Sequence, residues 1–371
     1  MKIVVDENIP GAAQCFAQFG EVVTRSGRQI CPADVQDADA LIVRSVTKVN
    51  RALLAGTPVR FVGSTTIGSD HLDSEYLREQ NIHFCTAPGS NAESVVDYVL
   101  SVICTLEGLL ETLLGGGRVG IVGYGNVGKR LGQRLSAIGI PWRAYDPLLD
   151  PKQHPGLASL EEVVNSTLLS LHAPLTVSGP FPSFHMLDAS LLATMPASSV
   201  LLSAGRGEVV ATDELLSLID RRPDIRLALD VWEGEPAFSS ELAARCAIST
   251  PHIAGYSLDG KKTGLRMVAS ELAAFLGQSL HVDDSEAAAS APVVSCIGDD
   301  ALSVIREAVL AVYDVSGDSQ RFREIIHTPD RSEQFDLLRK HYPPRRELGY
   351  CHLHAENAAR TSLLRALQGG K

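Results

Sequence analysis

Short apolar runs alternate with more polar stretches along the first hundred residues of the chain. The runs have the length and the Val and Ile content of buried strands, and the stretches between them suit helices. Such alternation predicts a parallel sheet that is covered by helices on both faces. The predicted strands are Lys2–Val5, Glu21–Thr24, Ala40–Val43, Val59–Val62 and Ile82–Phe84.

A longer helix is predicted after Asn91, because apolar residues between Val95 and Leu106 recur with helical spacing. A second alternating series then runs from Arg118 to about Thr250. Its six apolar runs predict a doubly wound sheet, in which ligands bind at the C-terminal ends of the strands. The predicted strands are Val119–Val122, Arg143–Tyr145, Leu168–Leu171, Val200–Ser203, Leu227–Leu229 and Ala247–Ser249.

The rest of the chain does not continue this regular alternation of strands and helices. A helix over Lys262–Leu276 is expected to pack back on the first domain, which would leave a cleft between two domains. The polar, small-residue segment Asp283–Pro292 predicts a linker. Two further helices are predicted beyond it, over Leu302–Tyr313 and Arg331–His341. A region of this size after two α/β domains is most often an oligomerisation or regulatory module.

Three glycines follow the predicted strand Val119–Val122. Gly123 permits a tight turn, Gly125 removes a side chain so that a pyrophosphate can approach the backbone, and Gly128 lets the next helix lie close to the sheet. The N-terminus of that helix offers free N–H groups and a partial positive charge to phosphates. The turn therefore predicts a dinucleotide site; glycines that serve packing alone are the alternative.

Asp146 lies eighteen residues after the last of these glycines, at the end of the next predicted strand. An acid at this distance can accept hydrogen bonds from the hydroxyls of the adenosine ribose. A 2′-phosphate there would meet a carboxylate. The pattern therefore favours NAD over NADP as the cofactor.

Three residues that can do chemistry each follow a predicted strand of the second series: Arg206, Glu235 and His252. Oxidation of an alcohol by hydride transfer needs a group that takes the hydroxyl proton, and a histidine suits that role. A carboxylate beside the imidazole orients it and stabilises its charged form, which is the role we expect for Glu235. An arginine binds a substrate carboxylate and polarises the reacting oxygen, so this chemistry needs no metal.

Each of the three also has an ordinary structural explanation when taken alone. His252 would be a surface or capping residue, Arg206 a turn residue between two glycines, and Glu235 the start of a loop before a proline. Their joint occurrence after three strands, beside the glycine turn, favours the catalytic interpretation.

These motifs, in this order over residues 1 to about 280, resemble the D-2-hydroxyacid dehydrogenases. The resemblance implies that Arg206, Glu235 and His252 form the catalytic trio and that NAD is the cofactor. Two residues depart from the common family pattern: Ser203, where many members have Asn, and Ala211, where many have Asp. The residues that the resemblance places at the cofactor are Gly123, Gly125, Asn126, Val127, Gly128, Asp146, Thr176, Ala204, Gly205, Asp230 and Gly255.

Segments spread over the whole chain resemble family members whose hydroxy-acid substrate carries a carboxylate at one end and a phosphate at the other. By this resemblance Ser45, Thr66 and Tyr256 contact the substrate. Arg44 is placed by sequence to add positive charge, unless it is a solvated strand end. Arg345 and Arg346 would either reach a neighbouring subunit's phosphate pocket or form a solvated basic turn, and basic runs usually do the latter.

The resemblance implies two doubly wound parallel-sheet α/β domains, a Rossmann NAD domain and a flavodoxin-like substrate domain, followed by a C-terminal α+β dimerisation domain. The expected boundaries are 1–92 with 252–282 for the substrate domain, 93–251 for the NAD domain and 283–371 for the dimerisation domain. Two other functions stay open: a 2-hydroxyacid dehydrogenase for another substrate, such as 3-phosphoglycerate, and a non-enzymatic protein that senses NAD(H).

The net charge of −11 argues against nucleic acid or an anionic membrane as the main partner. The chain begins directly with a predicted strand, and its seven cysteines are scattered without paired spacing. We therefore expect a cytoplasmic protein without disulfides or structural zinc. The resemblance implies that it is a homodimer that acts on a small molecule.

Overall fold

The computed structural model describes residues 1–281 and 291–369. The chain forms two compact units, one of Met1–Asn91 with Ser257–Ser290 and one of Ala92–Tyr256 with Ala291–Lys371. This division places residues 252–256 and the C-terminal region in the second unit, so the three-domain scheme stays a prediction. Residues 283–290 of the predicted linker lie outside the described residues.

The first unit contains a five-stranded parallel sheet of order β2-β1-β3-β4-β5. This is the flavodoxin-like order, as expected. Strands β3 and β4 are buried along their whole length, because they lie in the middle of the sheet between two helical layers. The strands are β1 (Lys2–Asp6), β2 (Glu21–Arg25), β3 (Ala40–Val43), β4 (Phe61–Ser64) and β5 (His83–Cys85).

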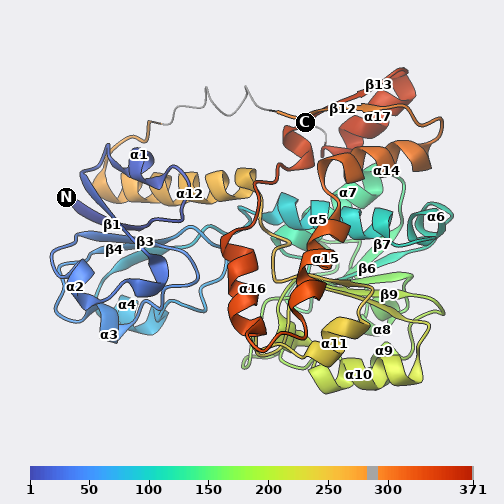
Figure 1. Cartoon of the computed structure of the whole chain (residues 1–371), viewed down its shortest axis with the longest axis horizontal. Coiled ribbons are helices and arrows are strands. Elements are labelled where there is room, and N and C mark those ends of the chain that lie inside the picture. Colours follow the sequence, from blue (N-terminus) through green and yellow to red (C-terminus); the bar gives the residue numbers. More distant parts are fainter. Residues whose placement is uncertain (282–290, 370–371) are drawn as a thin grey trace. The chain divides into compact units, whose positions relative to one another are not determined.

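Helices lie on both faces of this sheet (Figure 1), and an apolar core fills each face. One face packs against α1 (Ala12–Phe16) and the long helix α12 (Leu258–Leu276), which confirms that the chain returns to the first domain after residue 256. Side chains such as Leu265 and Val268 bring α12 into the core. The other face carries α2 (Pro32–Val35), α3 (Arg51–Leu54) and α4 (Ser74–Glu79).

The second unit contains a six-stranded parallel sheet of order β11-β10-β9-β8-β6-β7. An isolated parallel bridge between Ala144 and Leu157 adds one residue pair beyond β7. With this bridge included, successive strands lie progressively farther from β6 on each side of it, as in a Rossmann domain. The strands are β6 (Val119–Val122), β7 (Trp142–Tyr145), β8 (Leu168–Leu171), β9 (Val200–Ser203), β10 (Arg226–Leu229) and β11 (Ile248–Ser249).

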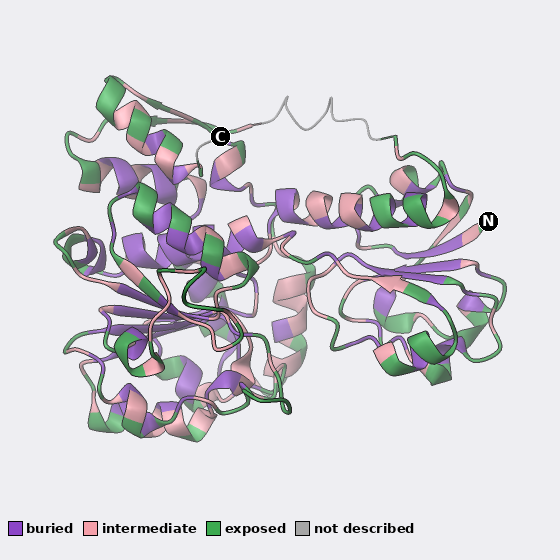
Figure 2. Cartoon of the chain, turned by 180° about the vertical axis from the view of Figure 1, so that it is seen from behind, coloured by how far each residue is buried: buried purple, intermediate pink, exposed green. Residues whose placement is uncertain are grey.

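Helices cover both faces of this second sheet, and its strands are buried between them (Figure 2). On one face lie α5 (Ala92–Thr105), α6 (Leu109–Leu114) and α7 (Asn126–Ala137). The other face is covered by α8 (Leu160–Val164), α9 (Ala189–Leu192), α10 (Thr212–Arg221) and α11 (Ser240–Arg245).

The C-terminal region has the α+β composition that the resemblance implied, and it packs as a small layer of the second unit. Strands β12 (Val293–Cys296) and β13 (His352–Ala355) pair in parallel. Helices α14 and α17 pack beside α5 and α7 and contribute to the same apolar core (Figure 1). The helices are α14 (Ala301–Val312), α15 (Val315–Ile325), α16 (Arg331–Lys340) and α17 (Ala358–Leu367).

Candidate active site

The glycine turn after β6 has the geometry that a dinucleotide site requires. Gly123 has a φ of +91°, which a residue with a side chain rarely adopts. A Cβ on Gly128 would lie 2.2 Å from the carbonyl oxygen of Gly123, so only glycine lets α7 start so close to the strand. A Cβ on Gly125 would meet no atom within 4 Å. Because Gly125 has no side chain, a space stays open beside the turn, and no nearby protein atom fills it.

The first turn of α7 is suited to a phosphate group. Asn126 begins the helix, no side chain caps its N-terminus, and Gly125 and Asn126 are exposed. Uncapped amides at a helix N-terminus attract anions. Val127 is half-buried, and the helix becomes buried at Gly128. These features fit the pyrophosphate of a dinucleotide.

Asp146 lies beside the same turn. One carboxylate oxygen accepts the N–H of Tyr124 at 3.0 Å, and the other accepts the N–H of Leu148 at 3.1 Å. These two bonds fix the carboxylate at the end of β7, and each oxygen keeps acceptor capacity. The position fits an acceptor for ribose hydroxyls.

Ala173 marks the point where the ends of β6, β8 and β9 converge. A Cβ on Gly123 would lie 2.7 Å from the amide nitrogen of Ala173, and one on Gly205 would lie 2.8 Å from its carbonyl oxygen. The half-buried Ala204 precedes Gly205. Beyond Ala173 the loop closes on itself, because the amide of Thr176 donates to Ser183 Oγ at 2.8 Å.

His252 and Glu235 form a direct pair. His252 Nδ1 lies 2.5 Å from Glu235 Oε1, and the two side chains are 28% and 24% exposed. Burial alone would raise the pKa of Glu235, but the charge and the hydrogen bond of His252 outweigh it and hold that pKa below its usual range. An ionised Glu235 fixes the imidazole with Nδ1 as the protonated nitrogen, which leaves Nε2 free to take a proton.

The buried carboxylate of Asp230 holds the backbone that carries His252. Its oxygens accept the amides of Ile253 at 2.8 Å and Ala254 at 2.9 Å, and the hydroxyl of Thr250 at 2.7 Å. His252 has a φ of +56°, a conformation that local constraints must maintain. Burial raises the pKa of Asp230, against the effects of His252 and of these donors. The resemblance placed Asp230 at the cofactor, and the structure gives it this positioning role besides; Gly255 follows in the same loop.

Arg206 is tied to the same end of the sheet through its backbone. It lies between β9 and a short 3-10 turn, Gly207–Val209. A Cβ on Gly207 would lie 2.0 Å from the carbonyl carbon of Trp232, so the Arg206 loop packs directly on the segment that leads to Glu235. The ends of β9, β10 and β11 thus bring the three proposed catalytic residues to one edge of one sheet.

The structure shows the surroundings of the two residues that depart from the family pattern. Ala211 cannot cap α10 with its side chain, but Glu233 Oε2 accepts the N–H of Thr212 at 2.8 Å instead. The hydrogen bond from this amide and the contact with His185 outweigh burial and lower the pKa of Glu233. Ser203 is buried at the end of β9.

The predicted substrate residues of the first unit have clear local environments. Arg44 pairs with the buried carboxylate of Asp6 at 2.8 and 3.2 Å, so most of its charge is already balanced. Ser45 is exposed directly after it. Thr66 is half-buried, and its hydroxyl lies 2.9 Å from that of Ser64.

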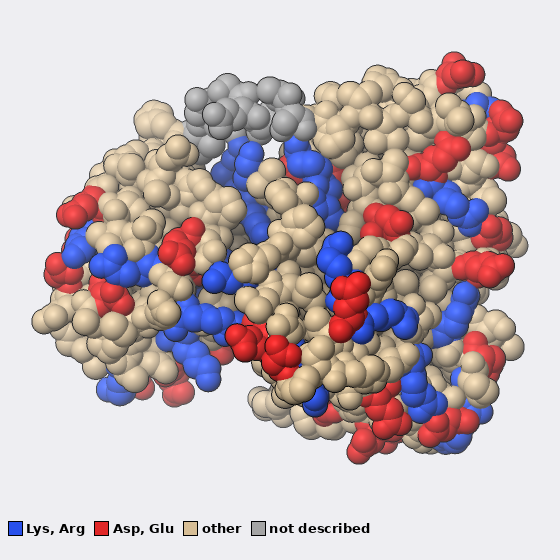
Figure 3. Space-filling view, viewed as in Figure 1, with Lys and Arg blue, Asp and Glu red and all other residues tan. Residues whose placement is uncertain are grey.

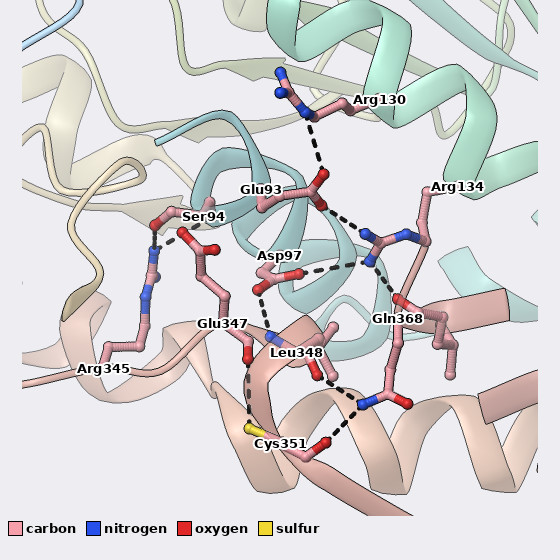
Figure 4. Close-up of polar contacts among 11 residues, drawn as sticks. Glu93, Ser94, Asp97, Arg130, Arg134, Arg345, Glu347, Leu348, Cys351 and Gln368 are labelled. Atoms are coloured by element: carbon pink, nitrogen blue, oxygen red, sulfur yellow. Dashed lines mark hydrogen bonds and ion pairs between the residues drawn. The ribbon is translucent and has the colours of Figure 1, made fainter. Parts of the chain in front are cut away.

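The C-terminal region reaches the His252 loop through Arg345, which also bonds Ser94 of α5 (Figure 4); sequence reasoning missed both contacts. Arg345 is only 7% exposed, so its interpretation as part of a solvated basic turn is wrong. Its guanidinium stacks on Tyr313 at 3.8 Å, hydrogen-bonds Ser94 and donates to the carbonyl of Ala254 at 2.7 Å. Arg346 is half-buried and lies against the ring of Tyr350 at 5.7 Å.

On the face shown in Figure 3, Lys and Arg side chains lie among Asp and Glu side chains. Among residues 1–281 and 291–369, no three His, Cys, Asp or Glu side chains gather as metal ligands would. No helix in that part of the chain has both the length and the apolar composition to cross a membrane.

Comparison with known proteins places the chain among dehydrogenases. Residues 105–254 match the NAD-binding domain of D-isomer specific 2-hydroxyacid dehydrogenases, and residues 294–368 match a domain of unknown function (DUF3410). Among solved structures, a 3-phosphoglycerate dehydrogenase of Entamoeba histolytica with bound NAD⁺ aligns with a TM-score of 0.64 at 24% identity, over 76% of this chain and 98% of that one. A D-lactate dehydrogenase of Aquifex aeolicus aligns with a TM-score of 0.61 at 20% identity, over 75% and 96%. Both share the fold.

Full-length relatives are more similar. Erythronate-4-phosphate dehydrogenase of Cellvibrio japonicus is 44% identical over 94% of this chain and 93% of its own length. The enzyme of that name from Edwardsiella ictaluri is 43% identical over 99% and 98%. The chain therefore belongs to the erythronate-4-phosphate dehydrogenases, within the NAD-binding D-2-hydroxyacid dehydrogenase family.

Proposed function

We propose that this protein oxidises the 2-hydroxyl group of 4-phospho-D-erythronate to give (R)-3-hydroxy-2-oxo-4-phosphobutanoate, in the synthesis of pyridoxal 5′-phosphate. The observation that carries the proposal is the 2.5 Å pair of His252 and Glu235 on the sheet that bears the glycine turn. Relatives with that enzyme name match nearly the whole chain, which supports the choice of substrate.

The proposed roles follow from the chemistry of each side chain. His252 Nε2 takes the proton of the 2-hydroxyl, and Glu235 stabilises the resulting imidazolium through Nδ1. Arg206 donates to the substrate carboxylate and polarises the reacting oxygen. NAD, when bound, accepts the hydride. Ser45, Thr66 and Tyr256 remain proposed substrate contacts, and Arg44 offers at most a charge that Asp6 already shares.

A substrate panel with NAD tests the proposal. Formation of reduced nicotinamide is followed with 4-phospho-D-erythronate, 3-phosphoglycerate and D-lactate. We expect the first to give the highest kcat/KM. Preference for 3-phosphoglycerate would make the protein a different dehydrogenase, and absence of turnover on the whole panel would favour a protein that only senses NAD(H).

His252→Ala should keep NAD affinity within about 3-fold and lose at least about 100-fold in kcat, the scale of one general base. An isothermal titration with NAD and a turnover assay on the same preparation check both parts. Near-normal turnover of this variant would remove His252 from the mechanism.

We also propose that the protein is a cytoplasmic homodimer that associates through its C-terminal region. Val293 and Ile297, at β12 and just after it, are 66% and 76% exposed, which leaves apolar surface for a second copy. Light scattering on the purified protein should give the mass of two chains. A monomer at micromolar concentration would contradict this assembly.

A further inference from the structure

Arg339, on α16, lies beside the proposed substrate residue Tyr256. Its guanidinium carbon is 5.7 Å from the centroid of the Tyr256 ring and 5.7 Å from that of Phe335. The side chain is 18% exposed, so it is largely enclosed yet still open on one side. Nothing in the proposed mechanism uses this arginine.

Electrostatic effects connect Arg339 to the His252–Glu235 pair. Burial alone would lower the pKa of Arg339, but Tyr256 and Glu235 outweigh it and raise that pKa. In return, Arg339 is one of the groups that hold the pKa of Glu235 below its usual range. The cation of α16 is thus within electrostatic range of the carboxylate that orients the proposed base.

Arg339 hydrogen-bonds the side chain of Tyr256 and still has donors to spare. Its contact with Asp336 measures 4.0 Å, which is too long for a hydrogen bond. Its buried Nε has no hydrogen-bond partner among the described residues. A guanidinium has five N–H donors in a fork that matches phosphate oxygens. An anionic ligand would satisfy a need that the protein leaves open here.

The substrate named in the proposed function needs such a group. It carries a carboxylate next to the reacting carbon and a phosphate at the far end. Arg206 is assigned to the carboxylate, and Glu235 would repel a phosphate dianion unless a cation lay nearby. Arg339 carries such a charge and acts electrostatically on Glu235.

We propose that Arg339 binds the phosphate group of the substrate, so that the C-terminal region of unknown function forms part of the specificity site. The inference rests on the proposed function, because it assigns one end of that substrate.

The test measures whether Arg339 recognises the phosphate in particular. KM and kcat are measured with 4-phospho-D-erythronate, and inhibition constants with inorganic phosphate and with unphosphorylated D-erythronate. Arg339→Met should raise KM for the substrate and the inhibition constant of phosphate by about 10- to 100-fold, the scale of charge-assisted hydrogen bonds. The inhibition constant of D-erythronate should change by less than about 3-fold, because that molecule lacks the group that Arg339 binds.

Lys340→Met is the matched control, because it removes one positive charge from an exposed neighbour on the same helix. It should leave all three constants unchanged. Arg339→Lys keeps the charge without the fork and should lie between wild type and Arg339→Met; it also provides a folded variant if the methionine variant does not fold.

Equal losses for D-erythronate and its phosphate would show a general structural role and overturn the inference. So would an unchanged inhibition constant for inorganic phosphate, even if D-erythronate does not bind measurably. Failure of the wild-type protein to oxidise 4-phospho-D-erythronate would instead refute the proposed function, and the two failures are therefore distinct.

Discussion

Gly125 and Gly128 lie three residues apart in one motif, yet the structure predicts opposite consequences for their replacement. A Cβ at position 125 meets open space, whereas a Cβ at position 128 would lie 2.2 Å from the backbone oxygen of Gly123. Gly125→Val should therefore leave the fold intact and fill the space beside the turn. Gly128→Ala should force α7 away from the strand.

The magnitudes follow from these two environments. Gly125 is the N-cap of α7 and makes no side-chain cap bond, so valine there should cost about 1 kcal/mol or less of unfolding free energy. Gly128→Ala gains about 1 kcal/mol of helix propensity. Against this, a clash with backbone that cannot rotate away should cost about 3 kcal/mol or more. The net effect of Gly128→Ala is therefore a loss of at least about 2 kcal/mol in the free energy of unfolding.

Thermal unfolding without ligand and titration with NAD separate the two effects. We expect Gly125→Val to shift Tm by less than about 4 °C, and Gly128→Ala to lower it by more than that. NAD should bind Gly125→Val at least about 10-fold more weakly, equivalent to 1.4 kcal/mol. Normal NAD affinity of Gly125→Val would refute the argument that the open space at Gly125 receives the cofactor.

Three further predictions test other parts of the site. Asp146→Ala should weaken NAD binding and reduce the preference for NAD over NADP, because the carboxylate no longer meets a 2′-phosphate; an unchanged ratio of kcat/KM for the two cofactors would place the selecting acid elsewhere. Arg345→Met removes a 2.7 Å hydrogen bond to Ala254 O and should lower kcat by about 10-fold with little change in NAD affinity, as stopped-flow and titration would show. Burial lowers the pKa of His71 to about 4. The neutral imidazole therefore favours the folded state above pH 6.5, and as the pH falls to about 4 the free energy of unfolding drops by up to about 3 kcal/mol. Urea unfolding of His71→Gln should show a flatter dependence of that free energy on pH over this range.

The central strands of both large sheets could be predicted from sequence because buried parallel strands such as β3 and β8 are short apolar runs. The pair β12 and β13 could not be. β13 has the sequence His352–Ala355 and alternates exposed and half-buried positions, so it carries no apolar run. Its partner is far away in the chain, and only tertiary packing brings the two together. Helices α15 and α17 were not predicted either.

The proposed catalytic residues could be selected from the sequence because each of them lies in a segment that follows a strand of one sheet. The contacts that hold these residues in place could not be predicted from the sequence. The hydrogen bonds of Asp230 to the loop of His252, and the contact of Arg345 with Ala254, depend on how distant segments fold back. A basic pair such as Arg345 and Arg346 is normally interpreted as solvated surface, because nothing in the neighbouring sequence indicates that Arg345 is buried.

Buried charges also show that the C-terminal region is an integral part of the nucleotide-binding unit (Figure 4). Arg134 of α7, 3% exposed, bonds Glu93 at 2.6 Å and also the carbonyl of Leu367 near the end of the chain. Asp97 of α5 accepts the amide of Leu348 at 2.9 Å, and burial raises its pKa to about 6 despite nearby arginines. Removal of the C-terminal region would break the bonds of Arg134 to Leu367 and of Asp97 to Leu348, whereas the Arg134–Glu93 pair joins α7 to α5 directly. The C-terminal region and the helix that begins at the glycine turn therefore belong to one folded unit, whatever that region contributes to assembly.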